Sequence, residues 1–295
     1  YLNDSIGKNV NKLTSVQLPT TLASGVFNGT SYQQEVYLGS RAPPSNLANV
    51  MNNPLVYSKA PTSSDNPNVN VQMSTSNDLY NEYVAFGSSV NFLSSKGKTI
   101  KLFGKDFAVD YSTDSTHLVL LKDSVNSVLT SDYPTATINA GKQYTVDLVS
   151  ASTSEATIKV TDENGNTQTN SVSELSSRKI LDLYIAVTNA DSNNLGYTAS
   201  LVIGMDKLTF SASDGSIRKG EVGEIISGTG VEFYDLSGPV NDVSSVKAII
   251  IRVLAPDSDH DAIKQGQRFV DPVFGTLKID FRNLNIAEDS VTDRE

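Results

Sequence analysis

The sequence predicts an all-β protein built from two β-sandwich domains of the immunoglobulin-like type, with only short helices. Short runs rich in Val, Ile, Leu, Tyr and Phe recur along the chain, and turn signals separate them about every eight to twelve residues. Many of these runs alternate apolar and polar residues, which is the period of a strand with one buried face. Hydrophobic residues make up only 38% of the 295 residues, which fits thin sandwich cores under a polar surface.

Residues 1–96 are expected to form a loop-rich N-terminal segment with few strands. YQQEVYLG (32–39) and YNEYVAFGSSVNFL (80–93) have strand character. Prolines recur between them, so residues 40–75 are expected to be mostly loop. Within that loop, residues 44–53 could hold one short helical turn.

Residues 97–227 are predicted to form a continuous central sandwich domain, because strand candidates follow one another closely there. The sequence DENGN at 162–166 predicts a tight hairpin turn, since Asn-Gly supplies the positive φ angles that such a turn needs. The candidate strands in this region are 99–103, 106–111, 117–121, 143–149, 155–161, 167–174, 180–190, 197–204 and 207–213.

One phrase occurs twice, as GKDFAVDY (104–111) and GKQYTVDL (141–148). Each copy is predicted to be the first arm of a β-hairpin, with its glycine permitting a tight corner at the entrance. Side chains of a strand alternate between two faces, so Asp110 and Asp147 are expected to point to solvent. The residues expected to face a core are Phe107, Val109, Tyr144 and Val146.

The last segment contains two strongly β-prone runs, VKAIIIRVLA (246–255) and FGTLKIDFRNL (274–284). Between them, PDSDHDAIKQGQ (256–267) predicts a short helix, because a proline and early acids precede a closing glycine.

The apolar runs before residue 96 have few local partners, and the same holds for the apolar runs after residue 228. Unpaired strands of this kind need neighbours. Residues 1–96 and 228–295 are therefore hypothesised to pair in one discontinuous domain, with 97–227 as an insertion.

Composition excludes several classes of function. The chain has 33 acidic and 23 basic residues and a net charge of -10, which argues against nucleic-acid binding. It has no cysteine, and therefore no disulfide or thiolate metal site. The longest apolar run, AIIIRVLA (248–255), is interrupted by Arg252, so no membrane span is expected. Because the chain begins at Tyr1, we expect a processed piece from which a signal peptide or anchor has been removed.

The sequence assembles no recognisable catalytic site, and the protein is not expected to be an enzyme. His117, one of two histidines, opens a predicted strand and is expected at a surface or edge. G-x-S-x-G, P-loop and H-E-x-x-H motifs are absent from the sequence, and the GTG at 228–230 lacks the rest of a dinucleotide fingerprint. Two carboxylates suffice for a glycosidase, so a secreted hydrolase is a weak third option.

The densest set of potential metal ligands is Asp257, Asp259 and Asp261. This spacing can present oxygen ligands to calcium. The EF-hand pattern is not met, however, because Ala262 replaces its glycine and Arg268 its bidentate glutamate. The favoured alternative is a helix N-terminus, where acids accept hydrogen bonds from free amides. A weaker calcium candidate is the turn with Asp162, Asn164 and Asn166.

Two N-x-[ST] sequons place glycosylation candidates at Asn3 and Asn28. Both lie in the irregular N-terminal part, where exposure is expected. Glycosylation would suit a protein of the cell envelope.

Several stretches resemble archaeal surface-layer (S-layer) proteins, which are secreted subunits that crystallise into a sheet around the cell. Residues 90–121 resemble a hairpin of that family with the pattern F-L-G-K-x-Y/F-x-V, which residues 102–109 fit. The resemblance covers roughly residues 80–285, whereas residues 1–79 match less well. The other similar stretches are 140–179, 197–215 and 269–281.

The resemblance implies an extracellular structural protein of the archaeal cell surface, without catalytic residues. Copies of the chain would assemble with one another into a lattice or a filament. No cofactor is required, although calcium could bridge acidic faces of neighbouring subunits. The chain would be a fragment of a subunit, or a relative that builds another surface appendage. The alternative is a surface adhesin or a carbohydrate-binding sandwich module. The lack of tryptophan argues against sugar binding, because sugar-binding clefts commonly stack sugar rings on tryptophan, but the 12 tyrosines could partly substitute.

Overall fold

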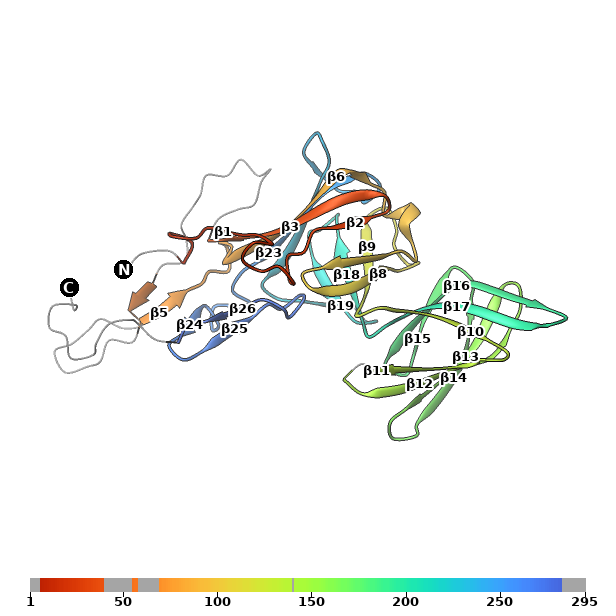
Figure 1. Ribbon diagram of the computed structural model, residues 1–295. Helices are drawn as coiled ribbons and strands as arrows, with labels where there is room; N and C mark the ends of the chain where they lie inside the picture. Colours follow the sequence, from red (N-terminus) through yellow and green to blue (C-terminus); the bar gives the residue numbers. More distant parts are fainter. Residues whose placement is uncertain (1–5, 40–54, 58–68, 140, 283–295) are drawn as a thin grey trace.

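The computed structural model describes residues 6–39, 55–57, 69–139 and 141–282, and it is all-β (Figure 1). The one helical element in these ranges is η1 (Leu93–Ser95), a 3-10 turn. It has neither the length nor the hydropathy to cross a membrane, and no other helix occurs in the described chain. The expected turn at 44–53 lies outside the described residues.

The largest sheet joins the two ends of the chain. Its strands follow the order β1-β3-β6-β23-β21-β22, and β2 pairs with β3. Antiparallel pairing sets Glu82 of β6 opposite Val36 of β3 on one side and Ile251 of β23 on the other. Strands that precede residue 96 therefore pair directly with strands that follow residue 228. The bounds are β1 (Lys12–Leu13), β2 (Gly25–Phe27), β3 (Thr30–Leu38), β6 (Tyr80–Val90), β21 (Thr229–Tyr234), β22 (Pro239–Val240) and β23 (Val246–Val253).

A six-stranded sheet packs against this seven-stranded sheet. Its order is β20-β19-β18-β9-β8-β7, with β7 (Thr99–Leu102), β8 (Lys105–Val109), β9 (His117–Lys122), β18 (Asp206–Ser211), β19 (Ile217–Lys219) and β20 (Glu224–Ile225). The two sheets share one hydrophobic core. Its fully buried aromatic residues include Phe27, Tyr80, Phe92, Phe103, Phe107, Phe233 and Phe274.

Two four-stranded sheets enclose a second core. One has the order β10-β17-β16-β15 and the other β11-β12-β13-β14. Their inward residues include Leu129, Val146, Ile158, Ile185 and Leu201. The bounds are β10 (Val125–Thr130), β11 (Thr135–Asn139), β12 (Gln143–Ala151), β13 (Glu155–Asp162), β14 (Thr167–Ser173), β15 (Ser176–Ile180), β16 (Leu183–Asn193) and β17 (Gly196–Gly204).

The stretch expected to be one central domain, residues 97–227, is divided between these two cores. Strands β7 to β9 and β18 to β20 contribute to the first core, because the inward faces of β8 and β9 point at the seven-stranded sheet. Only the strands between residues 125 and 204 build the second core.

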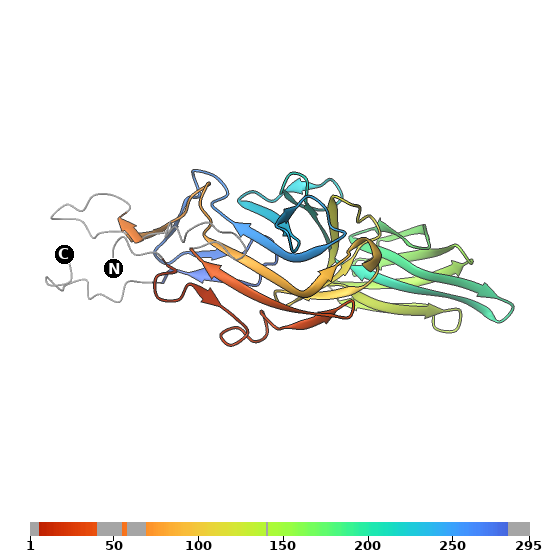
Figure 2. The same cartoon turned by 90° about the horizontal axis from the view of Figure 1, so that it is seen from above.

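A small apolar seam joins the two cores. Ala108 and Leu121, on the outer faces of β8 and β9, contact Tyr184 and Val202 of β16 and β17. Both faces of β8 are therefore covered. The backbone of Gly204 approaches so closely that a Cβ there would lie 2.6 Å from the Cβ of Leu121. The result is an elongated molecule with the β4–β5 and β25–β26 pairs towards one end and the β16–β17 hairpin at the other (Figures 1 and 2). The bounds of these four strands are β4 (Leu55–Tyr57), β5 (Val69–Gln72), β25 (Arg268–Val270) and β26 (Lys278–Asp280).

The repeated phrase occupies equivalent positions in two sheets. Gly104 and Gly141 have φ angles of +81° and +75°, as tight corners require. Each following strand pairs on both sides, β8 with β7 and β9, and β12 with β11 and β13, so each is more than the first arm of a hairpin. The four residues expected to face a core, Phe107, Val109, Tyr144 and Val146, are buried.

The expectation that Asp110 points to solvent is wrong. Asp110 is fully buried, because the chain turns back after β8 and its carboxylate accepts the amide of Ser112 at 2.8 Å. Asp147, at the equivalent position, lies on the outer face of its sheet and pairs with Lys159 at 3.1 Å.

The predicted helix at 256–267 is also wrong. The segment forms a turn followed by β24 (Ala262–Lys264), which pairs with β5 (Val69–Gln72). Ile263 is paired with Val71 of β5 and is buried in the first core. β5 also pairs with β4 (Leu55–Tyr57). Within the described part of the run, residues 274–282, the strand is β26 (Lys278–Asp280), which pairs with β25 (Arg268–Val270).

Candidate functional site

The acidic cluster at Asp257, Asp259 and Asp261 forms an exposed turn between β23 and β24. One carboxylate holds the turn together. Oδ1 of Asp257 accepts the amides of Asp259 at 2.9 Å and His260 at 2.8 Å, and it lies 2.8 Å from Nδ1 of His260. The hydrogen bond from the His260 ring is the main reason that the pKa of Asp257 is lowered.

This geometry does not gather the three aspartates around a common point. Within the ranges that the structure describes, no group of three His, Cys, Asp or Glu side chains is placed to hold one metal ion. The weaker calcium candidate is likewise a turn, because Oδ1 of Asp162 accepts the amides of Asn164 at 2.9 Å and Asn166 at 2.8 Å. The helix N-terminus proposed as the alternative for 257–261 is an Asx turn instead.

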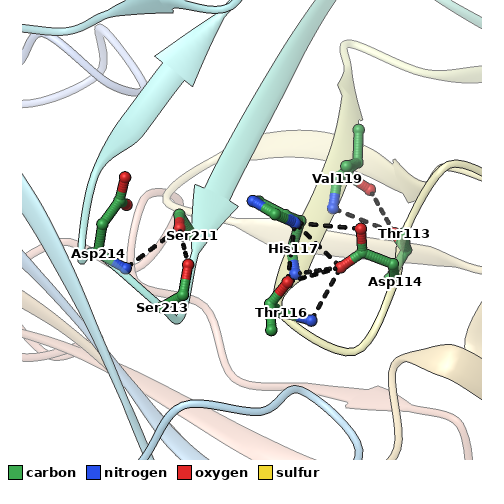
Figure 3. A network of polar contacts seen from close by, with 8 residues as sticks. All are labelled: Thr113, Asp114, Thr116, His117, Val119, Ser211, Ser213 and Asp214. Atoms are coloured by element: carbon green, nitrogen blue, oxygen red, sulfur yellow. Dashed lines mark hydrogen bonds and ion pairs between the residues drawn. The ribbon is translucent and has the colours of Figure 1, made fainter.

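The other histidine lies in the same kind of turn. Asp114-Ser-Thr-His117 and Asp257-Ser-Asp-His260 share the pattern D-S-x-H. In the first turn, Oδ1 of Asp114 accepts the amides of Thr116 and His117, both at 2.8 Å, and lies 3.0 Å from Nδ1 of His117 (Figure 3). Both histidines of the chain therefore brace tight turns.

The environment of His117 invites comparison with a Ser-His-Asp triad. Ser211 is its partner residue on the neighbouring strand β18, and Figure 3 shows both with Asp114. Ser211 is buried, however, and its hydroxyl group lies 3.1 Å from that of Ser213 and accepts the amide of Asp214 at 3.4 Å. No hydrogen bond joins His117 to Ser211 in the described part of the chain. The arrangement closes the β18–β19 turn and does not present a nucleophile.

The most unusual titratable group is Glu82, which sequence reasoning missed. Its side chain lies on the inward face of β6 and is fully buried, and neither carboxylate oxygen has a hydrogen-bond partner among the residues that the structure describes. Burial, and then the nearby charge of Asp271, raises the pKa of Glu82 well above its usual value. A carboxyl group in this position is held in its neutral form.

Asp271 lies in the turn that enters this region from the C-terminal side. Its carboxylate accepts the amides of Val273, Phe274 and Gly275 at 3.2, 2.8 and 2.9 Å. Burial raises the pKa of Asp271, although these amides counteract the shift. Glu82 and Asp271 are enclosed in the first core, so they are a feature of stability rather than an accessible site.

One of the two glycosylation candidates, Asn28, lies within the described residues. Asn3 lies outside the described residues. Asn28 is exposed in the β2–β3 turn, with a φ angle of 49° followed by Gly29 at 82°. Its Nδ2 donates to Oγ of Ser95 at 3.1 Å, and its Oδ1 accepts Nζ of Lys98.

A groove of about 420 Å³ runs along the seam between the two cores. Lys96, Gly97 and Lys98 form one wall, between η1 and β7. Strand β10, at the free edge of its four-stranded sheet, contributes to the opposite side. The remaining lining residues are Tyr111, Asn126, Ser127, Val128, Thr188, Ser200, Leu201 and Val202. Sequence reasoning could not find this groove, because it brings together residues from five separate elements.

The carboxylates and histidines that the sequence singled out as candidates thus serve turns, and the groove is lined by two lysines and no acidic residue. A function for this chain is inferred from these residues alone. No family model matches the chain, and no curated protein matches it in sequence.

Proposed function

We propose that the chain is a structural protein of the archaeal cell surface, whose copies assemble outside the cell into an S-layer lattice or a filament. Two immunoglobulin-like sandwich domains would form the subunit, with residues 125–204 inserted between β9 and β18 of the first domain. Such a protein works by holding a shape and by contacting its own copies, so it needs no catalytic group.

Strand β10 is the observation that carries this proposal. It lies at the edge of its sheet and reads VNSVLT, without a charge or a proline. Val125 and Val128 are 43% and 66% exposed. Monomeric proteins protect edge strands with lysine, proline or bulges, and β10 has none of these along its pairing with β17. An unprotected edge is suited to pairing with another chain.

Aspartates that close turns also support a structural role for the protein. Asp114, Asp162, Asp214, Asp235 and Asp257 each accept backbone amides two or three residues ahead. Turn-closing contacts of this kind make a rigid scaffold of short loops. The exposed Asn28 sequon adds a place for a surface glycan, and cations could bridge acidic faces of neighbouring subunits.

The edge strand gives a direct test. Val128→Lys places a charge on β10 and should lower the amount of protein that sediments as large assemblies. Val222→Lys is the matched control, because Val222 is 92% exposed in a loop and lies on no sheet edge. Equal sedimentation of Val128→Lys and the parent protein would contradict a role for this edge.

A carbohydrate-binding module is the second candidate, and one surface favours it. Tyr37 and Tyr83 pack edge to face, with ring centroids 6.1 Å apart, on the outer face of the seven-stranded sheet. Glu35 and Lys12 lie beside them and form an ion pair at 2.6 Å. Both tyrosines are half-buried. A glycan array distinguishes the candidates, because a lectin should bind sugars and stay monodisperse, whereas a lattice subunit should assemble without them.

A further inference from the structure

The groove along the seam carries positive charge in a protein whose net charge is -10. Lys96 and Lys98 are its charged residues, and no acidic residue lines it. Some other lysines of the described chain form ion pairs with carboxylates, for example Lys105 with Asp123 at 3.0 Å and Lys159 with Asp147 at 3.1 Å, whereas Lys122 and Lys247 donate to backbone carbonyls. Two lysines and no carboxylate therefore line the groove, and the charges that act on its lining residue Tyr111 are those of Glu174 and Asp110.

The two lysines are held by neutral groups. Nζ of Lys96 donates to the backbone carbonyl of Tyr111 at 3.1 Å, and Nζ of Lys98 donates to Oδ1 of Asn28. Neither forms an ion pair with a carboxylate of the described residues. These hydrogen bonds fix where the ammonium groups lie while leaving their charges unneutralised, which favours an incoming anion.

The wall between the lysines is also fixed in position. Gly97 has a φ angle of +77°, and a Cβ there would lie 2.7 Å from the hydroxyl group of Tyr111. Val128 and the polar side chains of Asn126, Thr188 and Ser200 complete the lining. An occupant therefore meets two cations, several hydrogen-bonding groups and one exposed apolar residue, which suits an acidic peptide segment.

The acidic turn between β23 and β24 has the matching chemistry. All residues from Pro256 to Asp261 are exposed, and Asp257 with His260 braces the turn. The side chains of Asp259 and Asp261 take part in none of its hydrogen bonds and remain for a partner. This turn is the densest run of acids in the chain.

We propose that the acidic turn 256–261 of one copy docks in the lysine groove of a second copy. The turn belongs to the part of the molecule that carries β24 and β25, whereas the groove lies at the seam beside β10 (Figure 1). One copy then leaves its own groove free for the next, so the contact is heterologous and continues into an open chain or a sheet. This inference rests on the proposed function and names the contact that would carry it.

Charge reversal tests the contact. Lys96→Glu with Lys98→Glu should raise the protein concentration needed for assembly by about tenfold, as expected when two attractive charge pairs become repulsive. Lys142→Glu with Lys219→Glu is the control of equal charge, because both lysines are exposed elsewhere on the surface. The melting temperature of each variant shows whether it is folded.

The complementary swap makes the test specific. Asp259→Lys with Asp261→Lys should fail to assemble alone, and it should co-assemble when mixed with the Lys96→Glu, Lys98→Glu variant. Assembly of the lysine variant at the parent's concentration would overturn the docking site while leaving the proposed function intact. A parent protein that stays monomeric at every concentration and salt would overturn both.

Discussion

The hydroxyl group of Tyr80 donates a hydrogen bond to Oδ1 of Asp271 at 3.3 Å, across 191 positions of sequence. Tyr80 belongs to β6 in the centre of the seven-stranded sheet. The carboxylate of Asp271 holds the turn that follows it by accepting the backbone amides of Phe274 and Gly275. This contact fixes the C-terminal turn beneath the sheet. It also brings a second carboxylate close to the buried Glu82, whose pKa responds to it.

Glu82→Gln should make the protein more stable at alkaline pH and change little in acid. The folded-state pKa of Glu82 is raised by burial and by Asp271, so the stability that its neutral form provides is complete below about pH 4 and is lost as pH rises through the raised value. Gln stays neutral throughout. At pH 8 we expect a gain of about 1–3 kcal/mol in the free energy of unfolding, measured by urea denaturation at several pH values.

Glu224→Gln is the control for that series, since Glu224 is exposed on β20 and its replacement should leave the pH profile unchanged. A parent protein whose stability relative to Glu82→Gln is the same at pH 4 and pH 8 would contradict a raised pKa of Glu82 in the folded state, because stability depends on pH only where the folded and unfolded pKa values differ.

Gly204→Ala should destabilise the seam between the two cores. The new Cβ would lie 2.6 Å from the Cβ of Leu121, and overpacking of this kind costs about 1–3 kcal/mol. Gly230→Ala is the matched control, because the nearest atom to its Cβ would be 3.6 Å away. Thermal unfolding checks both, and an unchanged melting temperature for Gly204→Ala would mean that the two units are not in contact in solution.

Asp114→Ala should weaken the turn that opens β9. Its carboxylate accepts two amides and contacts the His117 ring. Although partial burial acts to raise the pKa of Asp114, hydrogen bonds from Thr116 and His117 lower it overall. The contribution of the carboxylate is therefore present above about pH 4 and is lost as pH falls through the lowered pKa.

The expected loss for this variant is about 1 kcal/mol at pH 7, a modest figure because the side chain is more than half exposed. The difference between parent and variant should disappear near pH 2. Chemical denaturation at the two pH values measures it, and a difference that persists in acid would assign the effect to packing.

Chelation separates a role of calcium inside the subunit from one between subunits. The described residues bring no three acidic or histidine side chains around one point. We therefore expect EDTA to leave the melting temperature of dispersed subunits unchanged. If cations bridge acidic faces, the same treatment should release subunits from assemblies, which light scattering follows. A lower melting temperature of the dispersed subunit would place a structural cation within the chain.

Strand positions were predictable where one face of a strand is apolar. The runs at 32–38, 117–121, 155–161 and 197–204 lie in strands of the structure. The run 155–161 alternates between buried and more exposed residues, whereas 118–121 is a continuous buried run of β-prone residues. Strand β10 was not predicted. Its sequence VNSVLT has one buried residue, Leu129, so an edge strand of this kind carries little apolar pattern to detect.

Features that depend on distant partners could not be predicted. The sheet neighbours of Glu82 are Val36 and Ile251, and nothing in the local sequence YNEYV indicates that its glutamate faces a core. The predicted exposure of Asp110 was wrong for the same reason. Its burial arises where the chain turns after β8, which the local sequence does not indicate. At 256–261 the predicted helix N-terminus was wrong, although Asp257 does accept backbone amides there. A strand follows the turn, because pairing with β5 satisfies the backbone of β24.

Electron microscopy of the purified protein across a range of concentration tests the central claim most directly. We expect sheets or filaments with a regular repeat, and their formation should require about tenfold more protein when Lys96 and Lys98 are both replaced by glutamate. Dispersed single particles of the parent protein under all conditions, with no ordered assembly, would contradict it.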